Sequence, residues 1–174
     1  EAVPYVCALG AAVKASVDGM AVAAPRMARL RSQLLTNLDV FLRSAKEDLA
    51  ITVNGPFEAD QRLPHLLSVS VEGVDAAALV NFLGEDVAIS AGAACHSAPP
   101  ASAGDSGADS GGVADEYAGV SGVLKALGLS PARARSTVRI SVGVSTNDFD
   151  VDEGAAVIAE GMLAQLLSSA PPVQ

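Results

Sequence analysis

Residues 136–144, STVRISVGV, decide the fold because apolar and polar side chains alternate along them. In an extended strand, Val138 and Ile140 fall on one face, whereas Thr137 and Arg139 fall on the other. A strand with one apolar and one polar face is typical of an antiparallel sheet that packs helices against its apolar side. The stretch therefore predicts a half-buried strand that carries an arginine on its polar face.

The segments around this strand predict a mixture of short strands and helices. Residues 65–74, HLLSVSVEGV, alternate Leu67, Val69 and Val71 with serines, as a half-buried strand does. Further strands are expected within residues 49–60 and 85–95, and helices after Asp75, within 120–130 and within 146–167. The predicted fold class is α+β: a small, mainly antiparallel sheet with helices packed mainly on one face.

The first 45 residues predict two consecutive helices. Apolar residues recur at steps of three and four from Val3 to Met20, and Gly19 and Pro25 mark the end of this helix. Pro25 also suits the first turn of a second helix. The expected buried face of the second helix consists of Met27, Leu30, Leu34, Leu38, Phe41 and Leu42.

The composition excludes several classes of protein. The net charge of −9 and the pI of about 4.5 argue against nucleic acid and anionic membranes as partners. No run of about 18 uninterrupted apolar residues is present, so no membrane-spanning segment is expected. The N-terminus lacks the basic region of a signal peptide. With two cysteines there is no disulfide framework, and we expect a reducing compartment, the cytoplasm or alternatively the mitochondrion.

Cys95 follows a tract of small residues, AGAA, and precedes a segment rich in Ser, Ala, Gly, Pro and Asp that predicts a flexible loop over about residues 96–119. Four interpretations are open: an exposed cysteine without a role, a disulfide with Cys7, a metal ligand beside His96, or a nucleophile on a mobile arm. Two cysteines and two histidines are too few for a convincing metal site, so none is expected. Cys7 lies in an apolar helical pattern and is expected to be a buried, inert thiol.

Arg139 has two interpretations from its position alone. It is either an exposed charge on a strand, or a guanidinium presented in fork geometry to a carboxylate. The strand pattern does not decide between them.

Several short motifs resemble one family in the order in which they occur. They are residues 87–97, VAISAGAACHS, and residues 123–146, VLKALGLSPARARSTVRISVGVST, together with residues 62–70, RLPHLLSVS, and the opening EAVPY. His65 and Ala2 stand where the family usually has Asn. In these motifs the chain resembles the C-terminal region of the cysteine desulfurase and selenocysteine lyase family, which are class V, fold-type I enzymes that use pyridoxal phosphate.

The resemblance implies roles for three residues. Arg139 would pair with the α-carboxylate of the amino-acid substrate, Cys95 would receive sulfur as a persulfide or take part in selenium release, and His96 would be accessory. None of the lysines, Lys14, Lys46 and Lys125, follows a histidine as the cofactor lysine of the family does.

The missing lysine motif sets the expected domain organisation. Residues 1–174 would be a single small C-terminal domain, with the large domain that binds pyridoxal 5'-phosphate upstream of Glu1. The isolated chain is therefore expected to be inactive, and the full-length enzyme to be a homodimer that passes its chalcogen to an acceptor protein.

The first functional expectation is a selenocysteine lyase that releases selenium from L-selenocysteine to give L-alanine. His96 after the cysteine and Val142 in the SVG motif resemble lyase members of the family. A cysteine desulfurase acting on L-cysteine for iron–sulfur cluster or thiolation pathways is the close alternative. A non-catalytic docking or dimerisation module is the third.

Overall fold

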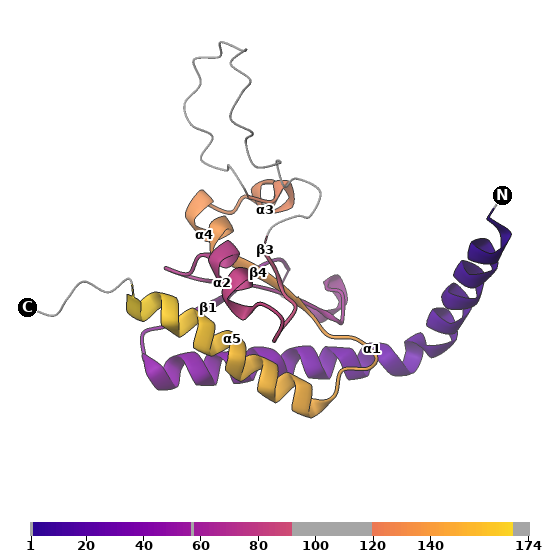
Figure 1. The fold of residues 1–174 in the computed structure, drawn as a ribbon, viewed down its shortest axis with the longest axis horizontal. Coiled ribbons are helices and arrows are strands. Elements are labelled where there is room, and N and C mark those ends of the chain that lie inside the picture. The colour runs from indigo at the N-terminus through magenta and orange to yellow at the C-terminus, as the bar shows by residue number, and fades with distance from the viewer. Residues whose placement is uncertain (1, 57, 92–119, 169–174) are drawn as a thin grey trace, which may run out of the picture.

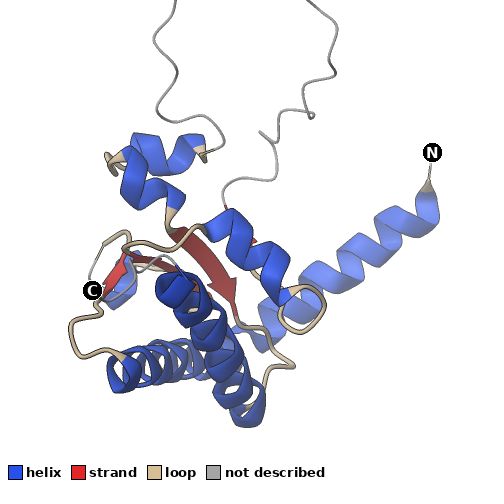
Figure 2. Cartoon of the chain, turned by 60° about the vertical axis from the view of Figure 1, so that its left-hand side comes forward, coloured by secondary structure: helices blue, strands red, loops and turns tan. Residues whose placement is uncertain are grey.

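The computed structural model describes residues 2–56, 58–91 and 120–168. These residues form an α+β domain in which a four-stranded antiparallel sheet packs against long helices (Figures 1 and 2). The elements in chain order are α1 (Val3–Ala45), β1 (Ile51–Val53), the 3₁₀ turn η1 (Ala59–Gln61), β2 (Leu66–Val71), α2 (Ala76–Leu83), β3 (Ser90–Ala91), α3 (Gly122–Ala126), α4 (Pro131–Arg135), β4 (Thr137–Ser141) and α5 (Asp148–Ser168). The predicted fold class is confirmed.

The sheet places β4 in its interior. The strand order is β1-β2-β4-β3, and every neighbouring pair is antiparallel. Arg139 of β4 is opposite Ser68 of β2 on one side and opposite Ser90 of β3 on the other. Because paired residues in a sheet point to the same face, these three side chains form one row across the polar face.

The apolar face of the sheet forms the core with α1, α2 and α5. Val69, Val71 and Val138 are completely buried, as their alternation predicts. In α5, the spacing of the apolar residues predicts an inward face of Val151, Ala155, Ile158, Met162 and Leu166. The first four are buried in the same cluster, and Leu166 is partly buried against it. Figure 1 shows α5 lying along the C-terminal part of α1 beneath the sheet.

A smaller pair of helices, α3 and α4, lies on the opposite side of the sheet from this core (Figure 1). Leu124, Leu129 and Ala134 form a separate apolar cluster there. The helices therefore do not all pack on one face, and α4 lay outside the sequence-based expectation. Its signals are local: Ser130 accepts a hydrogen bond from the Arg133 N–H as the N-cap, and Pro131 occupies the first turn.

The prediction of two helices in the first 45 residues is wrong, because α1 is continuous from Val3 to Ala45 with Pro25 inside it. Proline removes one backbone donor and bends a helix rather than always ending it. The ribbon changes direction along α1 in Figure 1, so that its N-terminal arm leaves the body of the domain. The leucines of the second half are buried as expected, but Phe41 is 41% exposed.

The N-terminal arm of α1 corrects two expectations. Cys7 is a free, exposed cysteine rather than a buried one. By length and composition alone, α1 also qualifies as a helix that could cross a membrane, although the sequence shows no uninterrupted apolar run. The interrupting charges, Lys14 and Asp18, lie one turn apart and pair with each other at 2.7 Å.

Polar contacts fix the beginning of α5 on α1. The Arg29 guanidinium donates to both carboxylate oxygens of Asp148, at 2.6 and 3.0 Å. Asp152, one turn further along α5, accepts from Gln33 and Asn37, which lie one and two turns beyond Arg29 on α1. These contacts set the register of the two helices whose leucines and alanines build the core.

Leu38→Ala should destabilise the domain by roughly 2–5 kcal/mol, since the Leu38 side chain is fully buried in the core. The measurement is the free energy of unfolding from urea titration. Val40→Ala on the same helix is the control, because Val40 is 55% exposed. A similar loss in both variants would contradict this packing.

Asp148→Asn should destabilise the domain slightly near neutral pH and less in acid. The hydrogen bond from Arg29 is the main reason that the pKa of Asp148 lies below its usual 3.8. A carboxylate with a lowered folded pKa stabilises above its unfolded pKa, and this stabilisation is lost as the pH falls through the folded value. Thermal melts of both proteins should therefore converge below pH 3.8. A gap that widens in acid would refute this.

Candidate functional site

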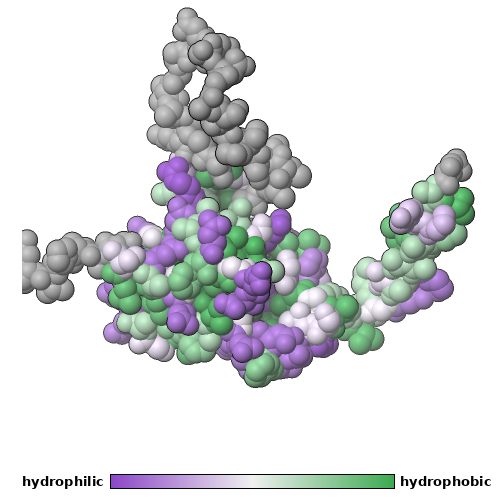
Figure 3. All heavy atoms as spheres, in the orientation of Figure 1, coloured by the Kyte–Doolittle hydropathy of each residue, from purple (hydrophilic) through white to green (hydrophobic). Residues whose placement is uncertain are grey.

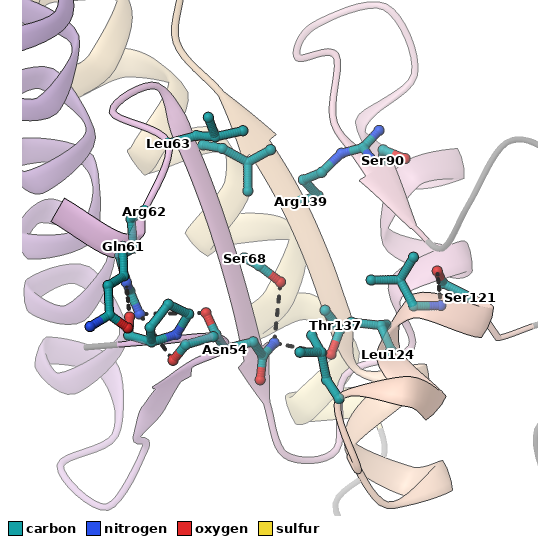
Figure 4. A pocket seen from close by; sticks show the side chains of 15 residues that line it. Asn54, Gln61, Arg62, Leu63, Ser68, Ser90, Ser121, Leu124, Thr137 and Arg139 are labelled. Carbon is teal, nitrogen blue, oxygen red and sulfur yellow. Dashed lines mark hydrogen bonds between the residues drawn. The ribbon is translucent and has the colours of Figure 1, made fainter. Parts of the chain in front are cut away.

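A cavity of about 360 Å³ opens on the polar face of the sheet. Its walls come from the turn after β1, the segment before β2, strands β2 and β4, the start of β3, and α3. Figure 4 shows side chains from these elements around it. The cavity thus lies between the sheet and α3.

Arg139 provides the unpaired positive charge of this cavity. Its side chain is exposed and extends from β4 toward Ser90 (Figure 4). Within the described part of the chain, its guanidinium has no hydrogen-bond or ion-pair partner. A planar guanidinium with five free donors in a cavity is suited to bind a carboxylate in a bidentate manner.

The second arginine of the cavity, Arg62, is already engaged. It donates to the backbone carbonyls of Asn54, Gly55 and Pro56 and so holds the turn after β1. The other walls are apolar, from Leu63, Leu66, Val123, Leu124 and Leu127, or carry hydroxyl groups. A small anion that enters this cavity therefore meets the Arg139 charge at its polar end.

Asn54 organises the polar side of the cavity, and sequence reasoning missed this role. Its side chain is 7% exposed, and the two hydrogens of its amide nitrogen are shared among the hydroxyls of Ser68, Ser70 and Thr137, at 3.3, 2.9 and 3.3 Å. Its amide oxygen accepts two hydrogen bonds from Arg133 of α4, at 3.0 and 2.7 Å, and a longer one from the Ser70 hydroxyl at 3.4 Å. The sequence marks Asn54 only as part of a turn. Its partners lie as far as 83 residues away, so no local pattern reveals them.

Asn54→Ala should lower the free energy of unfolding by roughly 1–3 kcal/mol, because buried hydroxyls and the Arg133 guanidinium lose their partner. Urea titration measures the change. The control is Gln33→Ala, which removes an exposed amide that bridges α1 and α5 through Asp152. This change should cost no more than about 0.5 kcal/mol. Equal effects would rule out a special role for Asn54.

Cys95 and His96 lie outside the described residues, as do the predicted loop at 96–119 and the possible disulfide partner of Cys7. The structure does describe where this segment leaves and rejoins the domain. Ser90 before it and Ser121 after it both line the cavity.

The cavity does not fit pyridoxal phosphate. The described residues that line it include no lysine to form a Schiff base and no carboxylate to pair with a pyridine nitrogen. Lys14 and Lys46 lie on or just after α1, and Lys125 on α3 is not among the lining residues. The lining therefore offers a guanidinium for an anion, but neither a lysine nor a carboxylate for this cofactor.

Solved structures share the fold. A NifS-like protein aligns over 98% of this chain with a TM-score of 0.65 and 22% identity, and the chain covers 35% of it. The NifS-like protein of Rickettsia africae ESF-5 aligns over 83% with a TM-score of 0.54 and 18% identity. The fold is thus that of one part of a NifS-like protein.

Curated relatives give the family, although no protein-family model matches the chain. The cysteine desulfurase IscS of Vibrio atlanticus is 33% identical over 141 residues, which are 81% of this chain and 30% of the relative. IscS of Vibrio cholerae is 33% identical over 130 residues, or 75% of this chain and 25% of the relative. The chain belongs to the cysteine desulfurase and selenocysteine lyase family, and it corresponds to a C-terminal portion of its relatives that spans less than a third of their length.

Proposed function

We propose that this chain is the substrate-carboxylate and sulfur-accepting part of a cysteine desulfurase. Arg139 carries the proposal, because it is an unpaired guanidinium in a cavity, at the position where the family motif has its substrate arginine. The relatives found by sequence are cysteine desulfurases, which supports L-cysteine as the substrate more than L-selenocysteine.

The chain would contribute two groups to this reaction. Arg139 holds the α-carboxylate and thereby orients the substrate sulfur. The thiolate of Cys95 attacks that sulfur, an S–S bond forms as the Cβ–S bond breaks, and the carbon takes up a proton. The products are alanine and a Cys95 persulfide, so the sulfur changes carrier without an external oxidant or reductant.

The rest of the enzyme would have to supply pyridoxal phosphate, since this cavity does not fit it. The N-terminal arm of α1 offers a surface for such a domain. Along it, an apolar stripe is more than half exposed, formed by Val3, Val6, Leu9, Val13, Val17 and Met20. Figure 3 shows this arm projecting with mostly pale and green spheres. Contiguous exposed apolar side chains are typical of an interface. A homodimer and an acceptor protein for the persulfide belong to the same proposal.

Selenocysteine lyase activity is the second candidate, favoured by His96 after the cysteine and by Val142. The two activities differ in their products. A lyase with little desulfurase activity would release selenide from L-selenocysteine while forming little persulfide from L-cysteine.

The test uses the full-length protein encoded by the gene, with L-cysteine and L-selenocysteine compared as substrates. Arg139→Gln should lower kcat/KM for L-cysteine by at least about 30-fold, because truncating a charge-assisted pair costs roughly 2–5 kcal/mol. Cys95→Ser should abolish the protein persulfide, measured by mass spectrometry. Alanine formation measures turnover.

Cys7→Ser is the matched control, since it removes the other thiol of the chain and should leave persulfide formation intact. Unchanged kinetics in Arg139→Gln would remove the carboxylate assignment. Persulfide formation in Cys95→Ser would remove the sulfur-accepting role. A full-length protein that turns over neither substrate would favour the docking module.

A further inference from the structure

The Arg133 guanidinium of α4 contacts the candidate site only through another side chain. It does not line the cavity, and its hydrogen bonds go to the Asn54 amide oxygen and to the Val53 carbonyl oxygen at 3.4 Å. Asn54 in turn lies between Arg133 and the cavity, which it lines together with Ser68 and Thr137. Arg133 can therefore affect the cavity through the orientation of the Asn54 amide.

Arg133 determines which way this amide faces. A guanidinium has only donors, so the atom that receives two of its N–H groups must be the amide oxygen. The amide NH₂ group then faces the three hydroxyls of the sheet. The oxygen and the NH₂ group of an amide are of nearly equal size. If the guanidinium were removed, either of them could therefore face these hydroxyls.

The amide orientation decides what the Ser68 hydroxyl can do. Ser68 Oγ accepts from the Asn54 NH₂ group at 3.3 Å, so its own hydrogen is not needed for that contact. Ser68 lines the cavity and is the cross-strand neighbour of Arg139 on the same face. Its O–H group is thus available as a donor beside the guanidinium. If the amide were reversed, the Ser68 hydroxyl would donate to the Asn54 oxygen and would present an acceptor to the cavity instead.

The neighbouring hydroxyl does not compete for this role. Thr137 Oγ1 donates to the Arg133 carbonyl oxygen at 2.7 Å and lies 2.8 Å from Ser70 Oγ. Its hydrogen is directed to α4, and its oxygen accepts from the sheet side. The backbone of Arg133 therefore fixes Thr137 while its side chain fixes Asn54.

We propose that Arg133 is a positioning residue that, through the Asn54 amide, makes Ser68 a second hydrogen-bond donor to the substrate carboxylate held by Arg139. This inference rests on the proposed function of the cavity as a carboxylate site. Ser68 is then a binding residue and Arg133 acts through it.

The kinetic test compares Arg133→Met, Ser68→Ala and the double variant in the full-length enzyme. Each single change should raise KM for L-cysteine by roughly fivefold, the effect of about one hydrogen bond, and leave kcat within about twofold. The double variant should show no further rise, because both changes remove the same donor. Arg133→Lys, which keeps a charged donor, should restore part of the loss.

The control is Arg29→Met, which removes an arginine ion pair between α1 and α5 and should leave KM unchanged. Multiplicative KM effects in the double variant, or an Arg133→Met enzyme with unchanged KM, would overturn the proposal. So would a fall in kcat alone, which would indicate a smaller folded fraction.

A second measurement does not depend on turnover. In the ¹⁵N-labelled 174-residue chain, the Asn54 side-chain NH₂ signals should exchange slowly with water in the wild type and rapidly in Arg133→Met. Equal exchange in both proteins would show that Arg133 does not hold the amide, whatever the enzyme does. If the full-length protein lacked desulfurase activity but its Asn54 signals were protected, the proposed function would be refuted. The conclusion that Arg133 orients the Asn54 amide would still stand.

Discussion

The two-sided character of β4 is the constraint on which both the core and the cavity depend. Val138 and Ile140 point into the helical layer, whereas Thr137 and Arg139 line the cavity between the sheet and α3. Moving this strand by one residue would exchange the two sets and bury a guanidinium among leucines. The antiparallel pairing of β4 with strands on both sides prevents that movement. The position of Arg139 is therefore maintained by the same contacts that build the core.

The polar face is stabilised differently from the apolar face. Its buried hydroxyls and the Asn54 amide are all hydrogen-bonded, and among the described side chains no buried polar atom lacks a partner. This network joins the end of β1, strands β2 and β4, and α4 through one amide. Since buried polar groups require satisfied partners, the network restricts how α4 can lie on the sheet. The cavity wall is thus positioned by directional contacts rather than by extensive packing.

Local patterns predicted much of this structure. The alternation in β2 and β4 and the spacing in α5 each lie within one element, and the structure confirms them. The errors arose where distant contacts decide. Pro25 signals a helix end locally, yet the helix continues through it. The partners of Asn54 are distant in sequence, and no local pattern reveals them. Arg139 was identified as a candidate, but only the cavity distinguishes it from an ordinary exposed charge.

α1 combines two very different environments in one helix. Beyond Pro25 its leucines are fixed in the core, whereas the arm before Pro25 has little tertiary contact to reinforce it. Helices without such contacts are only marginally stable in water. Resistance to local opening should consequently decline along this single element toward its N-terminus, so that one continuous helix joins persistent and transient backbone.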